Sequence, residues 1–468
     1  MKKILFISLL LTITNLGVAQ DISGAWNGIL KIRGMELRVV FNLAKEADGY
    51  SSTMDSPDQG AFGIPMSSTE FDNNQLKLTH TAATIVYIGT LSEEEKIIGT
   101  FTQGGQSFPM DLTRSIPEKK AVIRPQEPAK PYPYLSEDVE IINYADSVKL
   151  VGTLTIPSNK SKYPIVILIS GSGPQNRDEE LLGHKPFLII SDYLTRNGIA
   201  VLRFDDRGTA KSTGNFSSAT SYDFTKDVEA AISYLKTRQD IDNTQIGLVG
   251  HSEGGIIAPM VAARSKDVDF IVLMAGTGVR GDELLLMQQE AIGKVSGSSE
   301  AELASMRSIN RQLFDIVLDN RNQDSLKSEL KTLMHHIIND IHDSLMPQGI
   351  SDEDFIEMTI NQLDTPWMKY FITHDPVDNL KQVKCPVLAI NGSNDLQVPA
   401  KVNLNAIQQA LQSGGNTKVT INEIPGLNHL FQESLTGNPA EYAEIEQTFS
   451  PVALKIIADW INKTTTGL

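Results

Sequence analysis

The pattern of apolar and polar positions divides the 468-residue chain into an alternating first part and a longer second part with continuous apolar runs. In the first part apolar and polar residues alternate, as in Leu37-Val39-Phe41 and Thr84-Val86-Ile88. A period of two is typical of strands with one buried face. The sequence therefore predicts a small all-β domain, a barrel or sandwich, over residues 20–114, with Trp26 at one end of it.

A proline-rich stretch, from Pro117 to Pro133, follows this domain. Proline lacks a backbone N–H and fixes φ, so this density excludes a helix or a central strand. Residues 115–135 are therefore predicted to be a linker between two domains.

From residue 136 onward, apolar runs alternate with helical segments, which is the pattern of a mostly parallel α/β sheet flanked by helices. The predicted strands are 148–156, 163–170, 199–204, 246–249, 270–274 and 386–390. We expect the first of them to be antiparallel to its neighbours. Ligands of such sheets bind beyond the carboxyl ends of the strands, so the residues after each strand are the candidates for a functional site.

Residues 276–376 are rich in Leu, Met, Glu, Gln and Lys at helical spacing. They predict a helical cap inserted into an α/β domain made of residues 136–275 and 377–468. Such a cap covers an active site and limits the access of water. Three aromatic residues are candidates for the lining of its pocket: Trp367, Tyr370 and Phe371. For each of them, packing in the hydrophobic core is the alternative.

Charge and cysteine content narrow the class of protein. The formal net charge is -16 and no long Lys/Arg run occurs, which argues against nucleic acid or an anionic membrane as a partner. The one cysteine, Cys385, excludes an intrachain disulfide and lies in an apolar run.

The N-terminus has the pattern of a signal peptide. Lys2 and Lys3 precede a short apolar run, and Ala19 stands where a signal peptidase would cut. Residues 1–19 are therefore predicted to be removed, and the protein is expected in the periplasm or outside the cell. No cysteine follows the apolar run, so we expect no lipid or membrane anchor.

The segment Gly250-His251-Ser252-Glu253-Gly254 carries the most specific chemistry of the chain. It follows an apolar strand and precedes a run of small residues that begins a helix. A serine between two glycines at a sharp strand-to-helix turn is a nucleophile elbow, because the glycines allow the backbone to approach closely. Ser252 is therefore the candidate nucleophile.

Two more post-strand residues supply the partners that a serine nucleophile needs. Asp395 follows the strand that ends at Ile390, and His429 comes later in a loop with Gly426. The chain order Ser, Asp, His is that of the α/β-hydrolase arrangement. We expect His429 to act as base and then acid, and Asp395 to orient its imidazole.

A glycine-containing loop after residue 170 is the candidate oxyanion hole. The backbone N–H of Ser172, or alternatively that of Gly173, would act with the N–H of Glu253, the residue after the nucleophile. The reaction needs no cofactor. The cap contains His335, His336, Asp340 and His342, but no tight ligand motif such as His-Glu-x-x-His, and we predict no metal site.

Five segments of the α/β part resemble the serine esterases of the α/β-hydrolase superfamily. They are Gly171-Ser172-Gly173-Pro174, Asp205-Asp206-Arg207-Gly208, Gly250-His251-Ser252-Glu253-Gly254, Gly392-Ser393-Asn394-Asp395 and Asn428-His429. The resemblance implies the α/β-hydrolase fold and a bracing role for the segment around Arg207. Ser170 departs from it, since many relatives have a His-Gly pair there, and this leaves the choice of oxyanion amide open. The first domain resembles lipocalin-like β domains that precede catalytic domains in some secreted bacterial enzymes.

Together these features predict a serine carboxylesterase that acts on a small-molecule ester. An amidase or peptidase is the alternative among enzymes, because the same triad serves both reactions. A protein that has lost catalysis and binds a glycan or another partner is the alternative of a different class.

Overall fold

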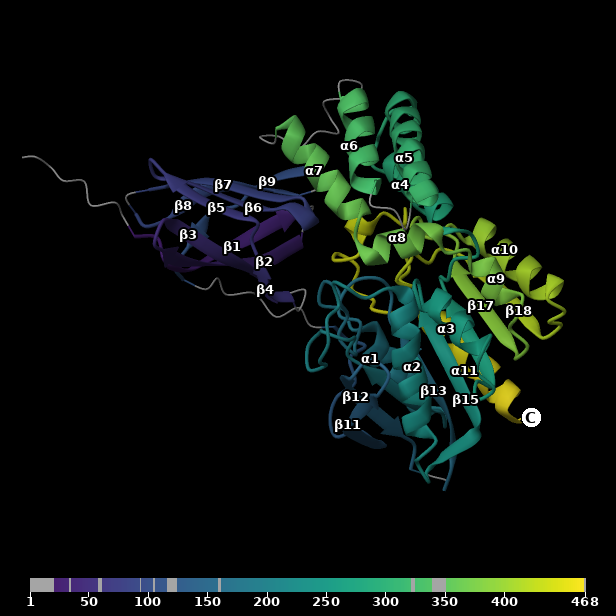
Figure 1. Ribbon diagram of the computed structural model, residues 1–468. Coiled ribbons are helices and arrows are strands. Elements are labelled where there is room, and N and C mark those ends of the chain that lie inside the picture. Colours follow the sequence, from purple (N-terminus) through teal and green to yellow (C-terminus); the bar gives the residue numbers. More distant parts are fainter. Residues whose placement is uncertain are drawn as a thin grey trace, which may run out of the picture.

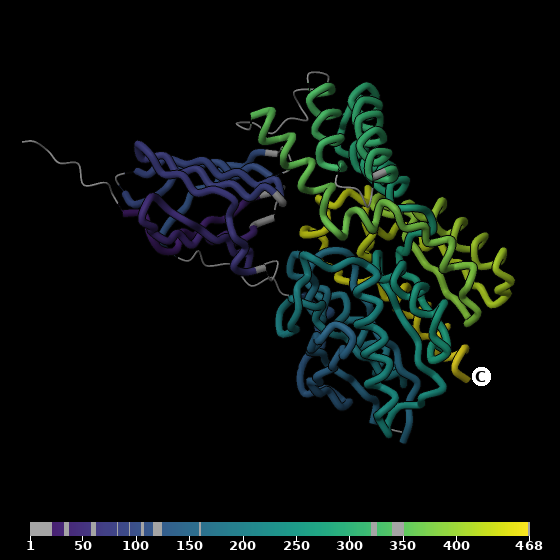
Figure 2. The backbone as a smooth tube through the Cα atoms, viewed as in Figure 1, coloured from purple at the N-terminus to yellow at the C-terminus, as the bar shows by residue number. Residues whose placement is uncertain are grey.

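A computed structural model describes residues 21–32, 35–57, 61–92, 94–103, 106–115, 124–158, 161–320, 325–338 and 351–466. The predicted signal peptide, residues 1–19, lies outside these ranges. The described chain forms a β domain, an α/β domain and a group of helices above the α/β domain (Figure 1). The tube view shows the same three parts (Figure 2). Among the described residues, no helix is both long and apolar enough to cross a membrane.

The first domain is an antiparallel β half-barrel, drawn in purple and blue in Figure 1. Its described strands follow the order β4-β3-β2-β1-β10-β8-β7-β6-β5, with β9 paired to β8. The two ends of the sheet approach each other where Ser52 Oγ lies 2.7 Å from Thr69 Oγ1. The strands are β1 (Gly24–Ile32), β2 (Met35–Glu46), β3 (Gly49–Ser56), β4 (Ala61–Pro65), β5 (Ser68–Asp72), β6 (Gln75–His80), β7 (Ile85–Leu91), β8 (Ile97–Gln103), β9 (Gln106–Pro109) and β10 (Leu112–Thr113).

Trp26 lies in the core of this half-barrel and is 1% exposed. Its indole N–H donates a hydrogen bond of 2.8 Å to the backbone oxygen of Ile22. The guanidinium of Arg114 lies 3.8 Å from the centre of the ring and covers it. The polar end of the tryptophan is therefore satisfied while its apolar body fills the core.

The second domain is built on an eight-stranded sheet, counted over the described residues, with the order β11-β12-β14-β13-β15-β16-β17-β18. β12 is antiparallel to β11 and to β14, and the other neighbours are parallel. The strands are β11 (Leu135–Asn143), β12 (Val148–Ile156), β13 (Tyr163–Ile169), β14 (Ala200–Phe204), β15 (Ile241–His251), β16 (Phe270–Met274), β17 (Val387–Gly392) and β18 (Val419–Ile424). This arrangement confirms the predicted fold class.

Helices cover both faces of this sheet because its central strands are apolar on both sides. On β13, Ile165 and Ile167 face one core, and Val166 and Leu168 face the other. The helices on the first face are α2 (Ser221–Leu235), α3 (Gly254–Ala262), α9 (Pro376–Leu380) and α10 (Ala400–Ser413). Those on the second face are α1 (Pro186–Arg196) and α11 (Pro451–Thr466).

A helical cap lies between β16 and β17 in the chain, above the carboxyl ends of the strands (Figure 1). Its helices share a hydrophobic core of their own, centred on residues such as Leu330 and Ile356. They are α4 (Gly281–Val295), α5 (Glu300–Asn320), α6 (Leu326–Ile337), α7 (Asp352–Leu363) and α8 (Pro366–Thr373). Two short 3-10 turns, η2 (Thr81–Ala83) and η5 (Pro439–Glu441), lie in the β half-barrel and before α11.

Candidate active site

Ser252 stands on a sharp turn between β15 and α3. Its φ is +53°, a left-handed conformation that costs energy for a residue with a side chain. The turn is tight because a Cβ on Gly250 would lie 2.0 Å from the backbone oxygen of Gly254. A Cβ on Gly254 would lie 2.2 Å from the oxygen of Ile169 on the neighbouring strand. Only glycine fits these two positions, and the turn therefore presents Ser252 at the edge of the sheet, as a nucleophile elbow does.

His429 and Asp395 are in direct contact. His429 Nδ1 lies 2.8 Å from Asp395 Oδ2, and both side chains are buried. The other oxygen of Asp395 accepts the backbone N–H groups of Gln397 and Val398, at 2.8 and 2.9 Å. A carboxylate held in this way accepts the Nδ1 proton of His429 and leaves Nε2 of the ring able to take a proton.

The loop of His429 is fixed by its neighbour Asn428. The side-chain oxygen of Asn428 accepts the backbone N–H groups of Leu430 and Gln432, at 3.0 and 2.9 Å. The described structure has no hydrogen bond between Ser252 and His429. Such bonds are often long in an enzyme without substrate and shorten in the complex, so this geometry is compatible with proton transfer.

The loop after β13 brings further backbone donors to Ser252. Gly171 N–H donates to Glu179 Oε1 at 2.7 Å and is therefore occupied. Among the described contacts, no backbone partner uses the N–H of Ser172, Gly173 or Glu253. Ser172 and Glu253 line the same cavity as Ser252. Gly173, the alternative loop donor, is not among the described residues of this lining.

Sequence reasoning did not identify Glu179 and His251 as part of the site. His251 contacts both Glu179 and the backbone of His429. His251 Nδ1 lies 2.9 Å from Glu179 Oε1, and His251 Nε2 lies 3.0 Å from the backbone oxygen of His429. His251 is visible in the elbow motif as the residue before Ser252. No sequence signal identifies Glu179, because its approach depends on the path of the loop after β13.

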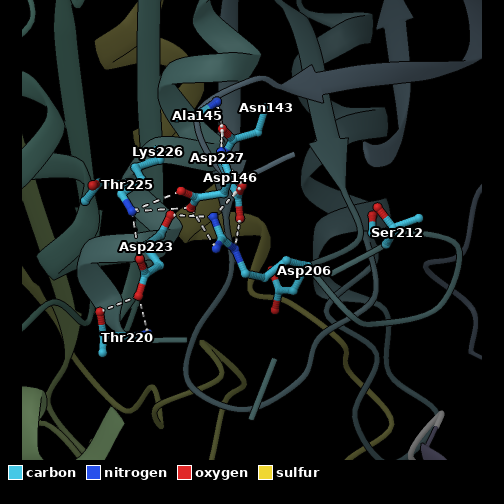
Figure 3. A network of polar contacts seen from close by, with 12 residues as sticks. Asn143, Ala145, Asp146, Asp206, Ser212, Thr220, Asp223, Thr225, Lys226 and Asp227 are labelled. Atoms are coloured by element: carbon cyan, nitrogen blue, oxygen red, sulfur yellow. Dashed lines mark hydrogen bonds and ion pairs between the residues drawn. The ribbon is translucent and has the colours of Figure 1, made fainter. Parts of the chain in front are cut away.

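A buried ion-pair network braces the loop after β14 (Figure 3). Arg207 Nε donates to Asp227 on α2 at 2.7 Å, and a second guanidinium nitrogen lies 3.0 Å from Asp146. Asn143 donates to the other oxygen of Asp227 at 2.8 Å. Burial raises the pKa of Asp227 in spite of the attraction of Arg207. The network therefore ties this loop to α2 and to the turn between β11 and β12.

Ser252 opens into a cavity of about 290 Å³ between the sheet edge and the cap. Half of the described residues that line the cavity are apolar, namely Ile256, Leu284, Leu285, Trp367, Phe371 and Val398. The other half are polar, namely Ser172, Ser252, Glu253, Thr277, Gln288 and Gln397. Of the three aromatic candidates in the cap, Trp367 and Phe371 therefore reach the cavity. The hydroxyl of Tyr370 instead points to Met260 Sδ, at 4.0 Å.

Glu253 is the ionisable residue in this lining. Its Oε1 accepts hydrogen bonds from Ser221 Oγ at 2.6 Å and from the Trp367 indole at 2.8 Å. Burial raises the pKa of Glu253 above its ordinary range, and both partners are neutral. The pocket therefore offers a substrate a carboxyl group whose charge is disfavoured.

The histidine-containing part of the cap is only partly described. Asp340 and His342 lie outside the described residues. His335 lies 3.5 Å from Glu353 of α7. Among the described residues, no group of three or more His, Cys, Asp and Glu side chains is placed to hold a metal ion.

The sheet order, the elbow at Ser252 and the His429–Asp395 contact define the class of protein: it is an α/β hydrolase. The sequence profile of the X-Pro dipeptidyl-peptidase (S15) family matches residues 146–423, more than half of the chain. The chain therefore belongs to the S15 family, and it is a serine hydrolase.

Individual proteins that match this chain share only a small fraction of its sequence. Esterase EstD of Thermotoga maritima is 23% identical over 414 residues, which are 88% of this chain and 79% of EstD. An uncharacterised 31.7 kDa protein of Escherichia coli is 23% identical over 280 residues, 59% of this chain and 87% of that protein. Among solved structures, an esterase of Pyrococcus furiosus is similar at 16% identity with a TM-score of 0.42, covering 75% of this chain and 98% of its own.

Proposed function

We propose that the protein is a carboxylesterase with Ser252 as its nucleophile, His429 as its base and Asp395 as the residue that orients His429. The observation that carries the proposal is the His429–Asp395 hydrogen bond of 2.8 Å beside a strained Ser252 that opens into a cavity with apolar residues on half of its lining. The similarity to an esterase over 88% of the chain supports the choice of ester as substrate.

The first half of the proposed reaction acylates the serine. Ser252 Oγ forms a bond to the ester carbonyl carbon while its proton passes to His429 Nε2. The carbonyl oxygen gains negative charge, which the N–H groups of Glu253 and Ser172 bind. The carbon–oxygen bond of the ester then breaks, His429 gives its proton to the departing alcohol, and the acyl group remains on Ser252.

Water completes the proposed cycle. His429 takes a proton from water, whose oxygen attacks the acyl carbonyl carbon at the same oxyanion site. The bond from the carbonyl carbon to Ser252 Oγ breaks, and His429 returns the proton to Oγ. The products are a carboxylic acid and the free enzyme, with no cofactor consumed.

The family name favours one other candidate, cleavage of a dipeptide from a peptide N-terminus. That reaction requires a site for the ammonium group of the substrate, and buried ammonium groups need an ionised partner. Among the described residues that line the cavity, Glu253 is the only acidic one, and its Oε1 is already occupied by hydrogen bonds from Ser221 and Trp367. This lining supports an uncharged ester over a peptide with a free N-terminus.

Hydrolysis of p-nitrophenyl acetate, butyrate and octanoate, compared with that of an Ala-Pro p-nitroanilide, tests the proposal. We expect ester hydrolysis by the wild type, no anilide hydrolysis, and loss of both ester turnover and fluorophosphonate labelling in Ser252→Ala. Anilide hydrolysis without ester hydrolysis would establish the peptidase instead. A wild type that is not labelled by the fluorophosphonate would favour the binding-protein alternative.

We further propose that the enzyme works in the periplasm or outside the cell, on the basis of the apolar run after Lys2 and Lys3. N-terminal sequencing of the protein recovered from its native host tests this location. A chain that begins at Gln20 supports the proposal, and one that retains residues 1–19 contradicts it.

A further inference from the structure

His251 presents both of its ring nitrogens to hydrogen-bond acceptors. The partner of Nε2 is the backbone oxygen of His429, which can only accept, so Nε2 carries a proton. The partner of Nδ1 is Glu179 Oε1, which also accepts the N–H of Gly171 at 2.7 Å. An ionised Glu179 satisfies both of its neighbours only if Nδ1 carries a proton as well. Two protons on one imidazole make it a cation.

The surroundings support a charged pair at this position. Both side chains are 7% exposed, so burial opposes each charge, and each must be compensated by its partner. Burial alone would lower the pKa of His251, but the charge of Glu179 and its hydrogen bond raise it, and Asp395 adds attraction. Two further titratable groups lie near the pair: His429, whose ring centre is 4.9 Å from that of His251, and Asp206, whose pKa the charge of Glu179 raises.

The pair connects the three parts of the candidate site. Glu179 holds the loop that carries Ser172, through the N–H of Gly171. His251 is the residue before Ser252 in the chain, and its Nε2–H holds the backbone of His429. One carboxylate oxygen and one imidazole ring therefore link the oxyanion loop, the elbow and the histidine loop.

We propose that Glu179 and a protonated His251 form a buried ion pair that fixes the oxyanion loop, the Ser252 elbow and the His429 loop relative to one another. Both are then positioning residues, since neither lines the cavity that Ser252 faces among the described residues. The expected effect of this ion pair on kcat rests on the proposed function, whereas the ion pair itself does not. The protonation of His251 is a property of the folded protein and can be measured without a substrate.

The protonation is tested by ¹⁵N NMR of the wild type labelled in its histidines, at pH 8, with assignment by His251→Asn and His184→Asn. We expect both nitrogens of His251 to have the chemical shift of protonated nitrogens. His184 is the internal control, because it is also buried and burial lowers its pKa to about 4, so that one of its nitrogens is unprotonated at pH 8. A neutral signature for His251 at pH 8 overturns the ion pair.

The positioning role is tested by Glu179→Gln, which keeps an acceptor for Gly171 but removes the negative charge. We expect kcat for p-nitrophenyl butyrate to fall roughly 10- to 100-fold with KM within about threefold, because the reacting groups lose their alignment while the cavity is unchanged. Glu229→Gln, which removes a surface ion pair with Arg264, is the control and should retain wild-type kcat.

The outcomes separate this inference from the proposed function. An active wild type with an unchanged kcat in Glu179→Gln overturns the positioning role alone. A wild type without ester turnover or fluorophosphonate labelling overturns the proposed function, and the NMR result then still decides whether the ion pair exists.

Discussion

The indole N–H of Trp367 donates a hydrogen bond of 2.8 Å to the side chain of Glu253, the residue that follows Ser252. Trp367 belongs to α8 of the cap, so this bond joins the cap to the nucleophile elbow. The ring of Trp367 also stacks on Phe371, with ring centres 4.9 Å apart, and both rings line the cavity. Glu253, the residue beside the candidate nucleophile, therefore fixes the position of the aromatic wall that Trp367 and Phe371 form.

Trp367→Phe removes this hydrogen bond and keeps an aromatic ring. A hydrogen bond between buried groups is worth about 1 kcal/mol, and its loss leaves Glu253 with one partner fewer. We expect KM for p-nitrophenyl octanoate to rise roughly fivefold, with a smaller change for the acetate, which reaches less of the wall. Trp460→Phe is the matched control, because the Trp460 indole bonds Thr420 on the far side of the sheet. Equal effects on the two esters would contradict this role of Trp367.

Asp395→Asn keeps the shape of the side chain but cannot hold His429 in the required tautomer. Replacement of the aspartate of a serine protease triad in this way lowers kcat about 10⁴-fold, and we expect a loss of roughly 10³- to 10⁴-fold here. The rate of p-nitrophenyl butyrate hydrolysis measures it. Asp459→Asn, at an exposed ion pair with Lys455, should retain wild-type activity. A loss of less than tenfold in Asp395→Asn would show that another residue orients His429.

Asp227→Asn removes one partner of the buried Arg207 and is expected to destabilise the fold. Breaking a buried ion pair costs about 3 kcal/mol or more, because a charge is left without its partner. Arg207 retains Asp146 at 3.0 Å, so we expect about 3 kcal/mol, measured by urea unfolding. The surface variant Glu229→Gln should cost at most about 1 kcal/mol. Similar losses in both variants would contradict the structural importance of this network.

The stability of the protein is expected to depend on pH through Asp206. Burial, together with the charges of Glu253 and Glu179, raises the pKa of Asp206 well above its ordinary value of 3.8. The folded state then binds this proton more tightly than the unfolded state, so the stabilisation is present at low pH. It is lost as pH rises from about 4 through the folded pKa, by about 1.4 kcal/mol for each pH unit in that window.

Asp206→Asn cannot ionise and tests this dependence. Its amide can still accept the N–H of Gln175 and donate to Ser170, the two partners of the carboxyl. We expect its free energy of unfolding relative to that of the wild type to rise between pH 5 and pH 8. A difference that is constant over this range would mean that the Asp206 carboxyl is ionised in the folded protein throughout.

The fold class was accessible from the sequence because its central strands are continuous apolar runs. The same runs locate Ser252 and Asp395, since Ser252 directly follows β15, Asp395 lies in the loop after β17, and the carboxyl ends of parallel strands meet at one edge. The edge strands β11 and β18 were not predicted. Neither strand has the continuous apolar run of the central strands: the second half of β11 alternates buried and exposed residues, and β18 mixes half-buried residues with exposed ones.

Contacts between loops were beyond the reach of sequence reasoning. The approach of Glu179 to His251 joins positions 72 residues apart, and it depends on how the loop after β13 turns back under the elbow. The bond between Trp367 and Glu253 likewise depends on how α8 lies on the α/β domain. Such contacts follow from the packing of elements, which local periodicity does not specify.

The contact between the cap and the β half-barrel affects what happens when the half-barrel is removed by truncation. Met358 of α7 is 4% exposed and shares a small cavity with Ile85 and Val86 of β7. A truncated protein that begins after the linker would present this methionine and its surroundings to water. The α/β part expressed alone would thus expose an apolar side chain on its cap that the half-barrel covers in the full chain.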